Sequence, residues 1–157
     1  MAFTVKFSVT SRLAAPATIV WARAVSWAGV NAELWPIRMT APAEWRQREI
    51  HTVPCGRKLF RSRILLWGVV PLDVHDFRLE SLGPGLQFQE DSTSWMNQQW
   101  RHRRTVVPDG PGDTGCVLTD QLEIVPRFAL LGFLLAPVYR LVFANRHRKL
   151  RRWHGVS

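Results

Sequence analysis

The sequence is poor in cysteine, tyrosine and acidic residues, and these shortages exclude several classes of protein. Its two cysteines, Cys55 and Cys116, are too few for a disulfide framework and have no metal-binding spacing. We therefore expect two reduced thiols in a cytoplasmic protein. No basic segment precedes an apolar core at the amino terminus, so we also expect no signal peptide.

Several motifs of catalysis and cofactor binding are also missing. The sequence has no glycine-rich phosphate loop, no Gly-x-Ser-x-Gly elbow and no Cys–His pair with local support. His75, His102 and Asp120 are the best candidates for a metal site, but no spacing among them supports one. We therefore expect no cofactor and no metal.

Tryptophan is abundant by contrast. The 157 residues contain eight tryptophans and one tyrosine, and 46% are hydrophobic while 21% are charged, which is ordinary for a folded soluble protein. This length suits one domain over residues 1–157 with a sizeable core. So many large aromatic rings favour a wide core or a ligand cavity lined with rings.

The net charge of +9 suggests an acidic partner such as nucleic acid, an anionic membrane surface or an acidic ligand. Much of the excess lies near the carboxyl terminus, and no nucleic-acid fold signature accompanies it, so we do not expect nucleic acid. A solvated helix end and a contact with anionic membrane lipids both remain open. The residues concerned are Arg146, Arg148, Lys149, Arg151 and Arg152.

The order of predicted elements favours an α+β protein. A strand at residues 3–11 precedes a helix at 14–27, which Gly29 ends, and Asn31 caps a short second helix that ends before Pro36. Residues 45–52 alternate loosely, and further strands joined by turns imply an antiparallel meander of about six to seven strands. These strands are predicted at 57–67, 72–82, 86–94, 97–107 and 117–125.

The last predicted helix covers residues 128–153. Its first part is apolar on nearly every side, so we expect protein to cover it, with the basic end in solvent. A membrane-spanning helix needs about 20 apolar residues. Pro137 and Arg140 interrupt the run, so we expect the helix to lie across the sheet rather than to span a bilayer.

The most informative stretch runs from Trp95 to Pro108. The two-residue period of a strand places Trp100, His102, Arg104 and Val106 on one face. If residues 86–94 and 97–107 form a hairpin, Glu90 lies opposite His102.

The turn between the strands at 97–107 and 117–125 sets His102 near Asp120, and Arg104 near Leu118. A register shift of two residues would keep this face and change the partners. Three interpretations stay open for the cluster: an acid–base site, a polar anchor for a ligand, and a charge cluster that only holds three strands together.

The chain resembles the START-like (SRPBCC) superfamily, which has the helix-grip fold of the birch-pollen allergen and of polyketide cyclases. The matching motifs are spread over nearly the whole chain, and the tryptophan–histidine and aspartate motifs resemble the superfamily's bacterial ligand-binding subgroup. They are Ala15-Pro16 with Val20-Trp21, Gly68-Val-Val-Pro-Leu-Asp73, Trp100-Arg-His102, Thr119-Asp120 and Asn145-Arg-His-Arg-Lys-Leu150.

The resemblance implies a curved sheet around the last helix, with a cavity between them. We therefore expect the chain to bind or carry a small hydrophobic molecule, either a lipid or an aromatic polyketide-like compound. Only some members are enzymes, so a cyclase or dehydratase that uses His102 with Asp120 or Glu90 as acid and base is an alternative. A third alternative is a peripheral membrane protein that binds through its basic helix end. The expected ligand contacts are Trp100, Arg104, Trp67, His75, Phe88 and Phe60.

Overall fold

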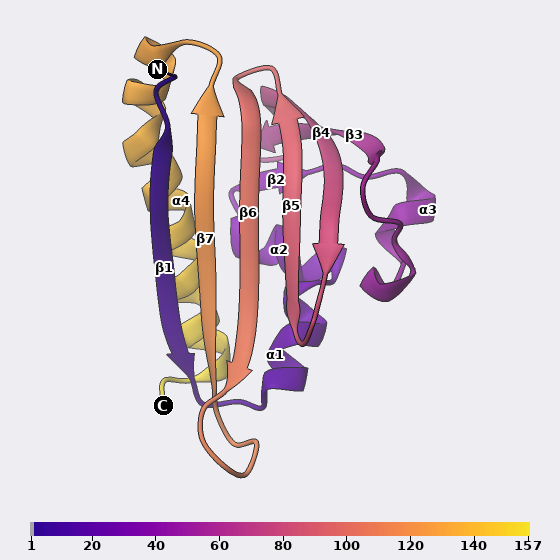
Figure 1. Ribbon diagram of the computed structural model, residues 1–157, viewed down its shortest axis with the longest axis vertical. Helices are drawn as coiled ribbons and strands as arrows, with labels where there is room; N and C mark the ends of the chain where they lie inside the picture. The colour runs from indigo at the N-terminus through magenta and orange to yellow at the C-terminus, as the bar shows by residue number, and fades with distance from the viewer. Residues whose placement is uncertain (1) are drawn as a thin grey trace.

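The computed structural model describes residues 2–157, which form one antiparallel sheet of seven strands with helices on its concave side (Figure 1). The strand order is β1-β7-β6-β5-β4-β3-β2, so the chain meanders from β2 to β7 and the first strand joins the far edge. The strands are β1 (Val5–Leu13), β2 (Ile37–Met39), β3 (Lys58–Leu66), β4 (Val70–Leu82), β5 (Gln87–Ser94), β6 (Asn97–Pro108) and β7 (Cys116–Pro126).

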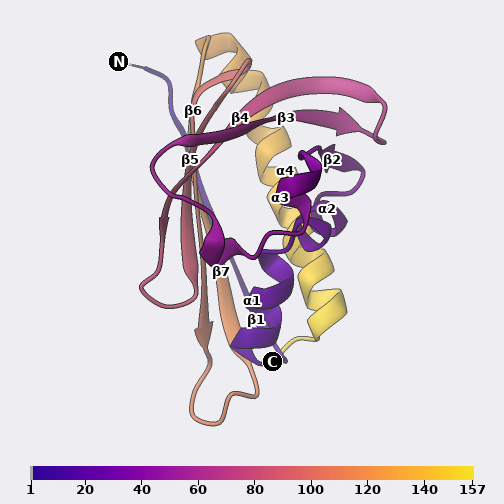
Figure 2. The ribbon, with the colours of Figure 1, turned by 90° about the vertical axis from the view of Figure 1, so that its right-hand side faces the viewer.

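The helices all lie on the side toward which the sheet curls (Figure 2). Helix α4 crosses this side and packs on β1 and β7. The long β3–β4 hairpin curves over it, which gives the helix-grip arrangement. The helices are α1 (Ala17–Ala24), α2 (Trp27–Leu34), α3 (Ala43–Arg46), the 3₁₀ turn η1 (Ile50–Thr52) and α4 (Ala129–His154).

The break between the first two helices differs from the sequence prediction. Helix α1 ends at Ala24, and Ser26 caps α2 by accepting a hydrogen bond from the backbone N–H of Gly29 at 3.0 Å. Gly29 and Asn31 therefore lie inside α2 rather than at a helix end and a cap. The side chain of Asn31 instead exchanges two hydrogen bonds with the backbone of Met39 in β2. Residues 45–52, read as a loose alternation, form α3 and η1.

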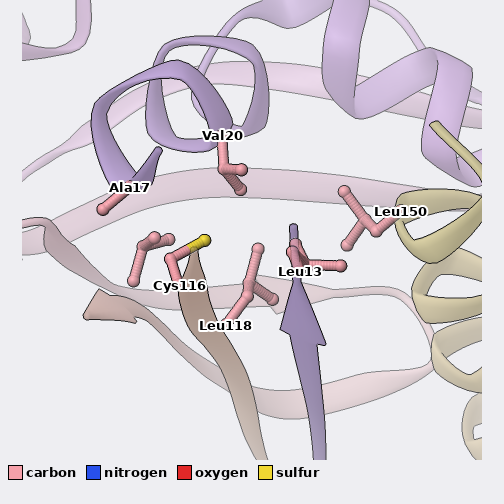
Figure 3. Packing of buried hydrophobic residues seen from close by; sticks show 7 residues of the cluster. Leu13, Ala17, Val20, Cys116, Leu118 and Leu150 are labelled. Carbon is pink, nitrogen blue, oxygen red and sulfur yellow. The ribbon is translucent and has the colours of Figure 1, made fainter. Parts of the chain in front are cut away.

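A closed apolar core lies where β1, β7, α1 and the last turns of α4 meet (Figure 3). Leu13, Leu118, Cys116 and Leu150 are fully buried there. Ala17 and Val20 of α1 pack against them, and burial raises the pKa of the Cys116 thiol. Side chains therefore fill the space between the sheet and the helices at this end of the molecule.

The register of the central strands is close to the prediction. Glu90 of β5 pairs with His102 of β6, as expected. Strand β6, however, is shifted by two residues against β7, so that Arg104 pairs with Asp120 and His102 with Leu122. Because the shift is even, all of these side chains keep the predicted face.

The first half of α4 corrects the expectation that protein would cover it. Its inner face approaches the sheet through Gly132 and Ala136, which are buried. A Cβ atom on Gly132 would lie 2.3 Å from Pro126 Cγ and 2.8 Å from Phe3 Cδ1, so only glycine permits this approach. The opposite face has no covering layer among residues 2–157, and Leu134 and Leu141 are 60% and 71% exposed.

The basic second half of α4 also differs from the predicted solvated end. Arg146 is buried, and Lys149 donates to the backbone oxygens of Ala32, Glu33 and Trp35. Arg151 bonds to Ser11. Only Arg148 and Arg152 of the five predicted cations are exposed, so most of this basic cluster holds the fold together.

Candidate functional site

A cavity of about 350 Å³ lies between the concave face of the sheet, helix α2, the α3–η1 segment and the middle of α4. This volume is in the range of small-molecule sites. Most of its lining is apolar, and both the sheet and the helices contribute aromatic rings to it. The aromatic lining residues are Trp27, Trp45, Phe60, Phe77, Phe88, Trp100, Tyr139 and Phe143.

One wall of this cavity carries a strip of buried polar side chains from three adjacent strands. His75 of β4, Glu90 of β5 and His102 of β6 all line the cavity. His75 Nε2 lies 2.6 Å from Glu90 Oε1, and the hydroxyl of Ser92 donates to the same oxygen at 2.7 Å. His102 Nδ1 lies 3.8 Å from Glu90 Oε2, so the carboxylate sits between two imidazoles.

The protonation of this strip follows from its partners. Burial alone raises the pKa of Glu90, but the facing imidazoles of His102 and His75 outweigh it and hold the pKa at about 2. An ionised carboxylate only accepts, so His75 donates from Nε2. Its Nδ1 has no hydrogen-bond partner within the described chain, which leaves it free for a ligand in the cavity.

Asp120 lies beside the cavity, between the sheet and α4, and contacts one guanidinium group and two imidazoles. It accepts two hydrogen bonds from the Arg104 guanidinium at 2.7 and 2.8 Å. The Nε2 atoms of His102 and His147 lie 2.7 and 2.8 Å from its two oxygens. Burial opposes ionisation, but Arg104 and His102 lower the pKa of Asp120 well below its ordinary value. Asp120 is therefore a fixed anion that orients His102.

A second buried carboxylate, Glu33 of α2, ties this cluster to the helices. It accepts from Arg104 Nη1 at 3.0 Å and from Arg146 Nε at 2.9 Å. Burial raises the pKa of Glu33, but these two guanidinium groups more than offset it and lower the pKa overall. The same contacts raise the pKa of Arg104 despite burial. Sheet, α2 and α4 are thus fastened by charge-assisted bonds.

The network ends at a serine that contacts His147. The Ser11 hydroxyl accepts from Arg151 Nη1 at 2.8 Å and lies 2.8 Å from His147 Nδ1. On its other side, His147 donates from Nε2 to the ionised Asp120. These contacts connect β1, β7 and α4 through one buried imidazole.

Aromatic rings enclose His102 more tightly than His75. The rings of Phe88 and Phe143 meet His102 edge-on, with centroids 5.3 and 5.2 Å away. His75 has one such neighbour, Trp100, at 6.0 Å. His75 is therefore the imidazole better placed to meet a bound molecule.

A second polar pair lies toward the first half of α4. Asn97 donates to the hydroxyl of Tyr139 at 2.9 Å. Burial raises the pKa of this phenol, while the hydrogen bond from Asn97 opposes the shift. Both residues line the cavity, so the pair adds polar atoms to its wall besides the histidine strip.

The predicted site residues divide into three groups. His75, Trp100, Phe88 and Phe60 line the cavity, as do His102 and Glu90. Asp120 and Arg104 are fully buried beside the cavity, between the sheet and the helices, and do not line it.

Trp67 lies outside the cavity and is 60% exposed. It adopts a left-handed φ of 52° in the β3–β4 turn.

Sequence reasoning missed Glu33, Arg146 and His147 as members of the cluster. Glu33 is the only acidic residue between residues 1 and 43, and it follows an apolar run in a helix. A lone acid in such a setting is a usable signal for a buried pair. Arg146 and His147 gave no such signal because they stand within a run of basic residues.

Within residues 2–157, no group of three or more histidine, cysteine or carboxylate side chains is arranged to hold a metal ion. The sequence matches the family described as a domain of unknown function (DUF8410) over residues 11–154. No curated protein matches it.

Solved structures with this fold are more informative. A Chromobacterium violaceum protein is 13% identical, with a TM-score of 0.69 over 97% of this chain and 99% of that one. The Zhui aromatase/cyclase from a Streptomyces species is 12% identical, with a TM-score of 0.68 over 94% and 92%.

A START superfamily protein from Mycobacterium smegmatis is 14% identical, with a TM-score of 0.60 over 92% and 98%. At these identities the likeness shows the fold alone, which is the START-like helix-grip fold that the sequence motifs implied.

Proposed function

We propose that this chain, which belongs to the DUF8410 family, binds a small hydrophobic molecule with a polar end in the cavity between sheet and α4. One observation carries the proposal: a cavity of about 350 Å³ whose apolar lining is interrupted by the His75–Glu90–His102 strip. The apolar walls favour burial of a hydrocarbon or aromatic body. The free Nδ1 of His75 offers one hydrogen bond to an oxygen atom of the ligand.

The charge network favours binding over catalysis by its carboxylates. A general acid or base works best when its pKa is near the operating pH. The pKa of Glu90 is about 2, and that of Asp120 lies well below its ordinary value, so both stay ionised near neutrality. Their proposed role is to hold the two imidazoles in place.

The experiment is a displacement titration with 1-anilinonaphthalene-8-sulfonate as the reporter. Two ligand pairs test both ligand classes: dodecanol against dodecane, and 2-naphthol against naphthalene. We expect the hydroxylated member of at least one pair to bind more tightly, because it satisfies Nδ1 of His75. His75→Gln keeps an N–H group for Glu90 and removes the ring, so it should lower this preference by roughly tenfold.

The matched control is His51→Gln, since the His51 side chain in η1 is 72% exposed and does not line the cavity. It should leave the affinities for both ligand pairs unchanged. The proposal fails if none of the four compounds displaces the reporter. It also fails if His75→Gln and His51→Gln give the same affinities as the unchanged protein.

A cyclase or dehydratase activity is the second candidate, and one observation favours it: two imidazoles line the cavity on either side of an ionised carboxylate. The Zhui aromatase/cyclase has the same fold. In such a reaction an imidazole would remove a proton beside a carbonyl, and a protonated one would assist loss of water. Mass spectrometry of a bound aromatic β-hydroxyketone would show loss of one water if this is correct, and unchanged compound if the site only binds.

The basic end of α4 is a weaker candidate for a membrane contact than the sequence suggested. Arg146, Lys149 and Arg151 are engaged with Glu33, backbone oxygens and Ser11. Membrane lipids interact with exposed cations, and only Arg148 and Arg152 of this cluster remain exposed. These two arginines alone are a small basis for a bilayer contact, which would need further exposed residues of the helix.

A further inference from the structure

The exposed side of the first half of α4 is unusually apolar for a surface in contact with water. We define the outer stripe as Phe128, Leu130, Phe133, Leu134, Val138 and Leu141, all of which are exposed. With 3.6 residues per turn, the stripe residues within α4 fall on one side of the helix, opposite buried Gly132 and Ala136. Apolar patches of this kind mark interaction surfaces.

The outer stripe is continuous with the cavity rim. Val138 is 47% exposed and also lines the cavity together with Leu135 and Met96. The backbone N–H of Arg127 donates to the oxygen of Met96 at 3.0 Å, which places exposed Trp95 next to the start of the stripe. A hydrophobic molecule that leaves the cavity past Val138 therefore reaches an apolar surface.

The charges around the stripe indicate the kind of partner. Helix α4 contains no aspartate or glutamate in 26 residues. Exposed Arg148 and Arg152 continue the outer face toward the carboxyl terminus, and exposed Arg140 lies at its edge. An apolar stripe with cations alone fits a bilayer surface with anionic headgroups. A second copy of the chain would bring like charges together and is disfavoured.

We propose that the outer stripe of α4 docks on the surface of an anionic lipid bilayer and presents the cavity rim to it. By length and composition α4 is long and apolar enough to cross a membrane, and 17% of its most apolar window is buried. In the docked state, however, its buried face stays on β1 and β7, so the helix lies along the surface. The stripe residues enter the acyl region, and the arginines contact headgroup phosphates.

The test is co-sedimentation of the full chain with vesicles of phosphatidylcholine alone or of phosphatidylcholine mixed with phosphatidylglycerol. We expect binding to the mixed vesicles that weakens as salt rises. Leu134→Gln and Leu141→Gln should each weaken it about tenfold, because each removes an apolar side chain that the bilayer would bury. Arg148→Gln should weaken it about fivefold.

The matched control is Ile19→Gln. Ile19 of α1 is 59% exposed and Leu134 is 60% exposed, but Ile19 lies on another surface. It should bind like the unchanged protein. The proposal is overturned if the unchanged protein does not co-sediment with the mixed vesicles. It is also overturned if the Leu134→Gln, Leu141→Gln double variant binds these vesicles as well as Ile19→Gln does.

It is also overturned if sedimentation in the absence of lipid shows a dimer that the double variant dissociates, because a second copy then occupies the stripe. The inference deepens the proposed function but fails separately from it. The displacement titration without vesicles reports the cavity, and co-sedimentation without added ligand reports the stripe.

Discussion

The two halves of helix α4 reverse the usual relation between polarity and burial. The first half is apolar, yet Leu130, Leu134 and Leu141 face solvent. The second half is strongly basic, yet Arg146 and His147 are buried with Phe143 and Leu150. The difference comes from the partners on the sheet and α2. Glu33 and Asp120 supply carboxylates for the second half, whereas Gly132 and Ala136 give the first half a narrow contact.

This contrast assigns the two halves different roles. Buried ion pairs contribute little net stability but are costly to break, so the second half fixes the arrangement of sheet and helices. Exposed apolar side chains contribute little to folding, so the first half is available for binding. Substitutions can test whether stability and binding are separated in this way.

The largest effect is expected from Glu33→Gln. This change keeps the size of the side chain but leaves Arg104 and Arg146 buried with less compensation, which should cost about 3–5 kcal/mol of unfolding free energy. Urea unfolding measures it. Glu80→Gln is the control, because the Glu80–Arg78 pair is about 40% exposed on both sides and should contribute about 0.5 kcal/mol or less. Equal values for both variants would remove the structural role of the cluster.

Alanine substitutions of two leucines on the same helix compare the halves directly. Leu150 is fully buried in the core of Figure 3, so Leu150→Ala should cost about 2–5 kcal/mol. Leu141 is 71% exposed, so Leu141→Ala should change the unfolding free energy by less than about 0.5 kcal/mol. Thermal or urea unfolding of the two variants measures both changes in unfolding free energy. A large loss from Leu141→Ala would mean that the first half is packed after all.

Low pH should reduce the unfolding free energy that the buried charge cluster contributes. The pKa of Glu90 falls from 4.5 to about 2 on folding, so its contribution is fully present above pH 4.5 and is lost as the pH falls toward 2. The loss is on the order of 3 kcal/mol. Glu33 and Asp120 shift in the same direction and add to it. Urea midpoints that stay constant from pH 5 to about pH 2 would contradict this assignment.

The smallest effect on stability is expected from Leu134→Gln. Its side chain is 60% exposed, so the unfolding free energy should change by less than about 0.5 kcal/mol while vesicle binding falls. Measuring both properties on one preparation sharpens the contrast between folding and docking. A variant that loses vesicle binding only because it unfolds would show a lowered urea midpoint.

Local patterns were enough to predict most of the fold. Alternation identified the strands and the face that carries Trp100, His102 and Arg104. The short β5–β6 turn fixed the Glu90–His102 pairing correctly. The β6–β7 pairing was wrong by two residues, because the glycine- and proline-rich turn between Pro108 and Cys116 does not fix where the second strand begins.

The buried cluster was only half predictable for a physical reason. His102, Asp120 and Glu90 lie on neighbouring strands, so strand pairing brings them together. Glu33 meets Arg104 and Arg146 across 71 and 113 residues of sequence, and no local spacing relates them. The polarity of α4 misled the prediction because burial depends on the partner side chains, which hydropathy does not include.

Native mass spectrometry of the purified full chain tests the central claim, that the cavity holds a small hydrophobic molecule, most directly. We predict one copurified molecule per chain, or one added dodecanol or 2-naphthol per chain, that is released when the protein is unfolded and is extracted into organic solvent. A chain that keeps its bare mass with both added compounds, and yields nothing on extraction, would contradict the account.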